Sequence, residues 1–288
     1  MEKNLYLELY RHLGVNPLAV NMAKGLISTK TIHSPSWKGF PPALLPFGET
    51  DSGIMYGYWK HWFAPFRQTT IVEFLGQTVF SRPLIAMEIA RTFRQFSYIQ
   101  LLKTITLSDG LDIPAEQLAS SFEIRDLAWL DTVSETSNDD PSALLDHEAF
   151  RADPPHYCFE DDTLYPGDFP RPGIENDPQR LAMTCGYEIH SRFGHGQPDP
   201  NRYRESVSKL PSSPVWLRES SQREVFERLL AASDIQGAWM SLNSIGWRFR
   251  DARVAIASLA EKVGDEVFTH FSEAWSSLPH EERMGENY

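Results

Sequence analysis

Residues 41–77 constrain the fold more than any other stretch, because short β-prone runs alternate there with turn residues. The two runs are residues 54–59 and 69–75, and both are rich in aromatic or β-branched side chains. Such side chains suit a pleated, half-buried surface, and the Gly, Asp, Ser and Pro residues around them are typical of turns. We therefore predict an antiparallel pair of strands. Gly57 inside the first run indicates either a bulge or a close approach of another backbone.

The aromatic residues of this region allow two interpretations. In an alternating strand about half of them face outward, and outward Trp and Tyr residues are typical anchors of binding sites. On this interpretation Tyr58, Trp59 and Trp62 bind a partner. Alternatively, a helix covers one face of the strands and the C-terminal helices cover the other, which buries the whole set. The set comprises Tyr56, Tyr58, Trp59, Trp62, Phe63 and Phe66.

Apolar residues recur at three- and four-residue spacing elsewhere, which predicts helices. The clearest covers residues 81–105, with Ser81 as candidate N-cap and Pro83 in the first turn. We expect it to cover one face of the strands, so that Trp59, Phe93 and Phe96 share one hydrophobic cluster. Further helices are predicted over residues 2–13, 15–26, 114–130 with Asp112 as cap, 216–232, 238–260 and 263–278, with breaks at Gly237 and Gly264 and a frayed tail over 279–288.

Residues 131–180 differ in character from the rest of the chain. They contain 13 Asp or Glu residues against three Arg, a net charge of −10 in a chain whose total is −12, together with seven prolines. Proline excludes long regular elements, whereas aromatic residues are scarce in disordered linkers. The aromatic residues between the acids therefore predict an ordered, loop-rich segment that presents its acids to solvent. Its candidate partner-binding residues are Asp161, Asp162 and Asp168.

Composition narrows the function classes. Hydrophobic and charged contents of 41% and 23% are those of a globular protein. A net charge of −12 makes nucleic acid a poor partner and a basic protein a plausible one. The two cysteines indicate a reducing compartment, and we expect a cytoplasmic protein because no signal peptide or membrane-spanning run is visible.

Motifs for nucleotide binding, serine hydrolysis and paired-cysteine metal sites do not occur in the sequence. Cys185 with His190 and His195 lacks the close ligand pairs of a structural zinc site. His156 and Cys158 lie in acidic surroundings, which oppose formation of a thiolate. We therefore expect no metal ion, no cofactor and no catalytic residue at these positions.

His61, between Trp59 and Trp62, is the remaining candidate for a general base. A histidine at the end of a strand is more often a packing or hydrogen-bonding residue. The alternative to a binding protein is accordingly a hydrolase that uses His61, or the pair His190 and His195, with a nearby acid such as Asp51.

The N-terminal part of the chain resembles a known family. A short helix, the motif Leu-Pro-Phe-Gly at residues 45–48, a turn ending in Ser52-Gly53, aromatic strands and a closing helix resemble the SUKH superfamily over residues 1–108. The resemblance implies an α+β protein, and many members are bacterial immunity proteins that neutralise polymorphic toxins.

We thus predict an α+β fold in which a small antiparallel sheet with flanking helices is followed by a loop-rich acidic segment and a C-terminal helical region. The predicted ranges are 1–108, 109–198 and 199–288. The expected function is non-catalytic binding, as an immunity protein that neutralises a basic toxin by direct contact through an acidic surface. We expect neither nucleic acid nor a membrane as a partner.

Overall fold

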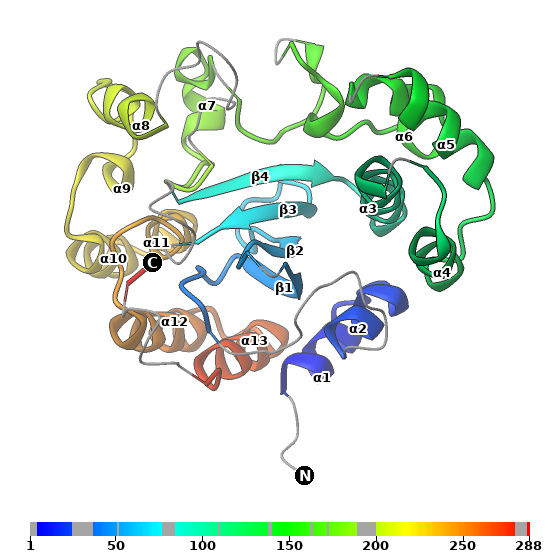
Figure 1. The fold of residues 1–288 in the computed structure, drawn as a ribbon. Coiled ribbons are helices and arrows are strands. Elements are labelled where there is room, and N and C mark those ends of the chain that lie inside the picture. Colours follow the sequence, from blue (N-terminus) through cyan, green and yellow to red (C-terminus); the bar gives the residue numbers. More distant parts are fainter. Residues whose placement is uncertain are drawn as a thin grey trace.

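A four-stranded antiparallel sheet lies at the centre of the protein, with helices on both of its faces (Figure 1). This α+β architecture is the predicted one. The strands are adjacent in chain order: β1 (Leu44–Glu49), β2 (Met55–Trp59), β3 (Thr70–Leu75) and β4 (Ile85–Ala90). The computed structural model describes residues 5–24, 37–50, 52–76, 84–108, 110–137, 140–161, 164–171, 173–188, 200–279 and 287–288.

The predicted strand pair is confirmed as β2 and β3, in which Gly57 lies opposite Val72. The helix predicted over 81–105 is wrong in its first part, because Ile85 and Ile89 belong to strand β4. Residues four positions apart share a face in a helix and also in a strand, so their spacing did not distinguish the two. The helix itself, α3, covers Phe93–Ser108. Ser81 and Pro83, its predicted start, lie outside the described residues.

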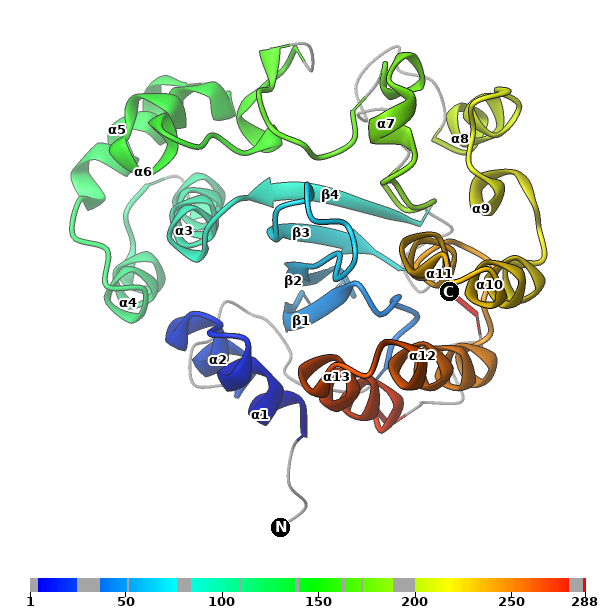
Figure 2. The same cartoon turned by 180° about the vertical axis from the view of Figure 1, so that it is seen from behind.

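The two faces of the sheet belong to two hydrophobic clusters. Trp59 and Phe74 point toward the C-terminal helices, whereas Tyr56 and Ile71 point toward α3. The C-terminal helices and α3 lie on opposite sides of the sheet in Figures 1 and 2. The prediction that Trp59 clusters with Phe93 and Phe96 is therefore wrong, because alternate side chains of a strand face opposite ways and α3 covers the other face.

The remaining helices follow the predicted ranges with additional breaks. Asp112 caps α4 as predicted, since its carboxylate accepts a hydrogen bond from Ala115 N at 2.8 Å. The helix predicted over 114–130 is interrupted at Glu123, which has a φ of 58°. Gly264, with a φ of 68°, ends α12 as predicted, but Gly237 lies inside α11. These helices are α1 (Leu5–His12), α2 (Pro17–Ala23), α4 (Ile113–Ser121), α5 (Leu127–Thr136), α8 (Pro200–Ser208), α9 (Val215–Arg218), α10 (Gln222–Ala231), α11 (Ile235–Leu242), α12 (Phe249–Val263) and α13 (Glu266–Ser276).

The acidic segment runs along the β4 edge of the sheet, above it in Figure 1. His156 N, within the segment, donates to the carboxylate of Glu88 at 2.9 Å, and just after the segment Tyr187 O accepts a hydrogen bond from Ala86 N at 3.0 Å. These contacts cover an edge that would otherwise offer unpaired backbone groups to other chains. After the end of α5 at Thr136, the described part of the segment contains only short elements, as predicted: η1 (Pro141–Asp146), α6 (Glu148–Arg151), η2 (His156–Cys158), η4 (Ile174–Asn176) and α7 (Pro178–Leu181).

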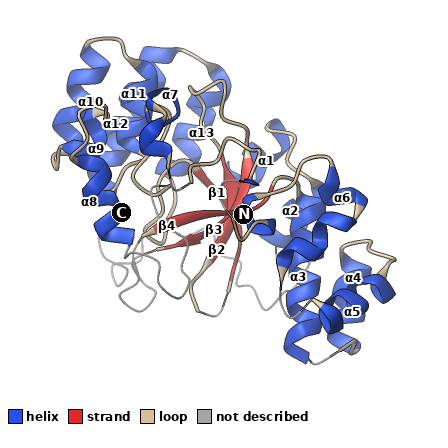
Figure 3. Ribbon diagram, turned by 90° about the horizontal axis from the view of Figure 1, so that it is seen from above, coloured by secondary structure: helices blue, strands red, loops and turns tan. Residues whose placement is uncertain are grey.

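The C-terminal helices and the sheet share one core. The larger hydrophobic cluster contains residues from Leu9 to Tyr288 and so includes members of all three predicted ranges. Tyr288 is fully buried, and its N–H donates to Trp247 O at 2.9 Å. The prediction of a frayed tail is therefore wrong at Asn287 and Tyr288. Viewed from above, α3–α5 and the C-terminal helices lie at opposite ends of the molecule (Figure 3). In the part of the chain that the structure describes, no helix combines the length and apolarity needed to cross a bilayer.

The predicted close approach at Gly57 is confirmed and gives a test of the sheet. A Cβ atom there would lie 2.7 Å from Leu45 O, which is backbone and cannot move aside. We expect Gly57→Ala to lower the free energy of unfolding by about 1–3 kcal/mol, the usual range for overpacking. Gly76→Ala is the matched control, because its Cβ would have no neighbour nearer than 3.4 Å. Urea unfolding of both variants checks this, and equal losses would contradict it.

Candidate functional site

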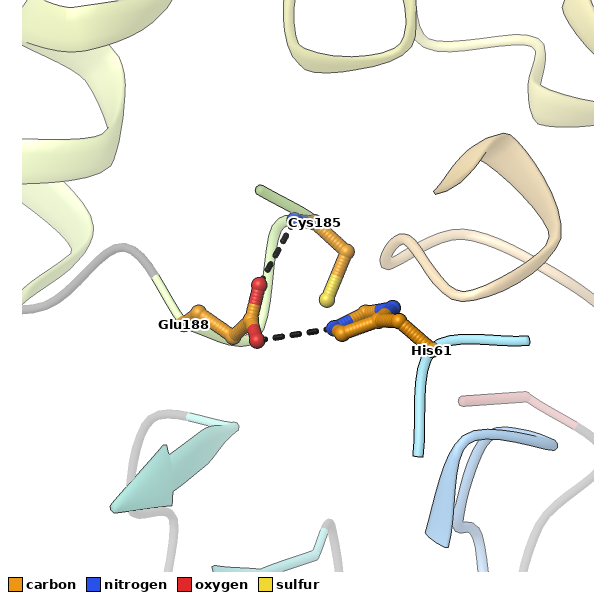
Figure 4. A group of neighbouring side chains, drawn as sticks. All are labelled: His61, Cys185 and Glu188. Carbon is orange, nitrogen blue, oxygen red and sulfur yellow. Dashed lines mark hydrogen bonds and ion pairs between the residues drawn. The ribbon is translucent and has the colours of Figure 1, made fainter. Parts of the chain in front are cut away.

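His61, the candidate base, lies just after β2 within a buried polar group (Figure 4). Its Nε2 is 2.9 Å from Oε1 of Glu188, which follows the acidic segment in the chain. The indole N–H of Trp59 donates to the same oxygen at 2.7 Å. Cys185, three positions before Glu188, donates its backbone N–H to Oε2 at 2.9 Å. His61 and Glu188, which meet in this group, are thus 127 positions apart in the sequence.

Arg67, from the β2–β3 connection, neutralises Glu188. Its guanidinium donates to Oε1 at 2.5 Å and to Oε2 at 3.3 Å, and also to Met183 O at 2.7 Å. The side chains of Arg67 and Glu188 are 4% and 0% exposed. Glu188 therefore accepts hydrogen bonds on both oxygens from an arginine, an imidazole, an indole and a backbone amide, which fully compensates a buried carboxylate.

The hydrogen-bond network favours one tautomer of His61. The indole N–H of Trp239, on α11, donates to His61 Nδ1 at 3.3 Å, which makes that nitrogen an acceptor. The proton of the neutral ring is then assigned to Nε2, which donates to Glu188, while the indole N–H of Trp59, 3.1 Å from Nε2, donates to the closer Glu188 Oε1 at 2.7 Å. Burial lowers the pKa of His61 below its ordinary value, although Glu188 opposes the shift. Burial, the largest single influence, would raise the pKa of Glu188, but the charge of Arg67, the neighbouring His61 and the hydrogen bonds from both together outweigh it and hold that pKa well below the usual range.

His61, Cys185 and Glu188 also form the one group of three potential metal ligands found among the described residues, with ligand atoms within 4.8 Å of one another. Without a metal ion, burial raises the pKa of the Cys185 thiol well above its ordinary value, and both oxygens of Glu188 already accept hydrogen bonds from Arg67. A metal ion would also lie beside the guanidinium of Arg67, which repels cations. The arrangement is therefore that of a neutral histidine and a buried ion pair. His190 and His195, predicted beside Cys185, lie outside the described residues.

Glu88, on β4, centres a second buried group. Its carboxylate accepts from Thr70 Oγ1 at 2.7 Å and from the hydroxyl of Tyr165 at 2.8 Å, and Arg91 lies 3.3 Å away. Burial raises the pKa of Glu88 despite the charge of Arg91. Asp168 is 3.1 Å from Arg91 and 3.9 Å from Arg67, so it connects the two groups.

The sequence predicted Asp168 as a solvent-facing, partner-binding residue, but in the structure it lies beside Arg67 and Arg91. Its side chain is 24% exposed, and it accepts from Gln68 N at 2.6 Å in addition to its arginine contacts. Asp161 is exposed as expected, and Asp162 lies outside the described residues. His156 and Cys158, within the acidic segment, are both buried, with 4% and 0% of their surface exposed.

The aromatic residues of the 41–77 region are mostly covered, as in the second interpretation above. Trp59 is 1% exposed and its polar atom is bonded within the core, so it offers no surface to a partner in this structure. Tyr58 and Trp62 are partly buried, and Trp62 packs on Phe271 at 5.1 Å between ring centroids. Phe66 alone in this set is largely exposed, at 77%.

No protein-family model, curated protein or solved structure matches this chain. The SUKH resemblance therefore stays a prediction that these comparisons do not test. Sequence reasoning missed Arg67 and Glu188, the central pair of the buried site. Neither belongs to a recognisable motif, and their partnership follows only from the folding of the chain just after the acidic segment onto the β2–β3 connection.

The ion pair gives a stability test. Glu188→Gln leaves the Arg67 charge buried, and loss of one partner of a buried pair costs about 3–5 kcal/mol. The pKa of Glu188 is lowered in the folded state, so its contribution is present above the unfolded value of about 4.3 and is lost as pH falls below it. We therefore expect the difference between parent and variant to shrink below about pH 4. Urea unfolding at several pH values measures it.

The matched control is Glu227→Gln, which removes an exposed carboxylate from its pair with Arg223. Exposed pairs contribute little, so this variant should unfold like the parent. A Glu188→Gln variant as stable as the parent at neutral pH would show that Arg67 does not depend on this carboxylate.

His61 gives the free energy of unfolding a second pH dependence, separate from that of Glu188. Its pKa is lowered by burial, so below about pH 6.5 the unfolded chain binds a proton that the folded chain does not. Stability therefore falls as pH decreases from this point, by at most about 1.4 kcal/mol per pH unit. We expect His61→Gln to reduce this slope, whatever its effect on stability at neutral pH. Unfolding free energies between about pH 7 and 5 check it, and equal slopes would contradict it.

Proposed function

We propose that this protein acts by binding a basic protein partner and not by catalysis. The observation that carries the proposal is the set of exposed carboxylates that the segment 131–180 presents, which we call the acidic face; two of them, Glu148 and Asp153, also pair with Arg94 and Arg91. The members of the acidic face are Glu135, Asp146, Glu148, Asp153, Glu160 and Asp161. Such a face attracts a basic partner over a distance of about a Debye length and orients it during encounter.

The acidic face is held in place by buried anchors. Tyr165 and Phe169 are 2% and 1% exposed, and Tyr165 is bonded to Glu88 beneath the segment. Asp168 also forms ion pairs with Arg67 and Arg91. A surface that is already ordered loses less conformational entropy on binding, which favours recognition by a loop-rich segment.

The surroundings of His61 support a role other than catalysis. Its side chain is 1% exposed, its neutral ring donates to an ion-paired carboxylate, and the thiol beside it stays protonated. A general base must reach the proton that it abstracts, and no substrate reaches this one without opening the core. The alternative hydrolase site at Asp51, His190 and His195 falls outside the described residues.

Among binding functions we propose toxin neutralisation, in the bacterial cytoplasm. The support is the SUKH resemblance of residues 1–108 together with the acidic face, because enzymes that act on nucleic acids are commonly basic. The test is co-expression with the product of the neighbouring gene. We expect that product to arrest growth alone and to be tolerated, as a stable complex, when this protein is present. Rescue without a complex would contradict direct neutralisation.

The acidic face gives a kinetic prediction. Neutralising it with Asp146→Asn, Glu160→Gln and Asp161→Asn should slow association with the partner, because long-range attraction contributes mainly to the on-rate. The effect should fade as salt shortens the Debye length to about 8 Å and below. Association rates at several salt concentrations measure it, alongside a thermal melt of each variant.

The control neutralises three exposed acids on other helices, Glu116, Glu224 and Glu261, by Gln substitution. It changes net charge by the same amount but leaves the acidic face intact, so its association rate should stay closer to that of the parent. Equal slowing in both variants would mean that net charge matters and the face does not.

A further inference from the structure

Three large apolar side chains are exposed where the chain passes from α3 to α4. Leu107 is 88% exposed, Ile113 is 69% exposed and Leu111 is 40% exposed. Among the described residues seven large apolar side chains are exposed, and three of them fall within residues 107–113. Exposed apolar residues that are scattered singly need no explanation, whereas a group of them indicates a contact surface. We call Leu107, Leu111 and Ile113 the apolar tip.

Folding does not account for the apolar tip. The turn is closed by its own backbone, since Gly110, with a φ of 129°, donates its N–H to Ile105 O at 3.1 Å. The start of α4 is specified by Asp112, its cap. Ile113, the first residue of α4, is β-branched and favours a helix less than a straight-chain residue does. A polar residue would serve the helix equally well, so the apolar side chain indicates a role outside folding.

The apolar tip adjoins the acidic face. Thr106 Oγ1 and Ser134 Oγ, on α3 and α5, lie 3.0 Å apart in a hydrogen bond. Leu107 follows Thr106 in the chain, and Glu135, a member of the acidic face, follows Ser134. The helices that carry the tip lie at the end of the molecule away from the C-terminal helices (Figure 3). A partner that meets the acidic face at Glu135 therefore also reaches the tip.

Electrostatics distinguishes between the possible occupants of the tip. A chain with a net charge of −12 is repelled by an anionic membrane surface and by a second copy of itself. Asp112 and Glu135 add negative charge beside the tip, and Lys103, one turn before it on α3, is paired with Glu73 at 3.4 Å. A basic protein is attracted by the same charges that repel the other two occupants.

We propose that the apolar tip is the short-range contact for a basic protein partner, which covers it with an apolar patch bordered by Lys and Arg residues. The border of that patch pairs with the acidic face. Interfaces commonly combine an apolar centre with a polar rim in this way. Long-range attraction governs mainly the association rate, whereas most differences in affinity between variants of one interface lie in the dissociation rate. This inference rests on the proposed function and assigns the tip a separate kinetic role within it.

The test measures association and dissociation rates of the complex with the product of the neighbouring gene. The tip variant combines Leu107→Ser and Ile113→Ser. We expect its dissociation rate to rise by about tenfold or more, because burying one such side chain is worth about that factor in affinity. Its association rate should stay near that of the parent, since no charge changes. The control combines Val254→Ser and Val267→Ser, which removes exposed apolar side chains from α12 and α13 and should leave both rates unchanged.

Thermal melts show whether each variant folds, and the substituted side chains are exposed, so we expect melting temperatures near that of the parent. An unchanged dissociation rate in the tip variant would overturn this inference. If the Asp146, Glu160 and Asp161 variant still associates more slowly, the proposed function would stand without it. Absence of any complex with the parent protein would overturn both.

Two further measurements on the protein alone examine the other occupants. Analytical ultracentrifugation should show a monomer, and the protein should not sediment with phosphatidylglycerol vesicles. A dimer that is lost in the tip variant would assign the tip to a second copy of the chain. Vesicle binding that is lost in the tip variant would assign it to a membrane surface. Either result would overturn the proposal.

Discussion

The buried ion pair between Glu188 and Arg67 connects parts of the chain that lie far apart in the sequence. Arg67 belongs to the turn between β2 and β3, Glu188 follows the acidic segment, and the pair lies 2.5 Å apart with both side chains out of solvent. Through His61 the same carboxylate reaches Trp239 on α11. The sheet, the acidic segment and the C-terminal helices are thereby fixed relative to one another at a single point.

A buried ion pair of this kind contributes more to selecting one conformation of the chain than to raising the free energy of unfolding. Removing two charges from water is costly, and their attraction offsets the cost only when every remaining hydrogen-bonding group is satisfied. Here the satisfaction is nearly complete, because Glu188 has four kinds of donor and Asp168 carries the connection on to Arg91 and Glu88. Any other placement of the acidic segment would leave one of these charges buried alone. The segment therefore has one favourable position on the β4 edge.

The charged residues of this chain consequently divide into two groups. Those that face inward, such as Glu88, Asp168 and Glu188, anchor this part of the chain to the sheet, while those that face outward form the acidic face. Asp168 is counted in the segment's net charge of −10 although it pairs with Arg67 and Arg91, so that count overstates the charge available to a partner. Because some acids anchor this part of the chain and others stay exposed, a proline-rich segment can present an ordered surface.

The sequence by itself determined the local elements that depend on nearest neighbours. Aromatic and β-branched runs specify β2 and β3, Asp112 specifies the start of α4, and Gly264 ends α12, because each effect acts within a few residues. Only the tertiary structure decided whether Ile85 and Ile89 form a strand or a helix, since a spacing of four places them on one face in either case. It also decided the burial of Trp59 and the role of Asp168, and it brought Glu188 to His61 across 127 positions. These outcomes depend on which surfaces meet after folding, and no local pattern records that.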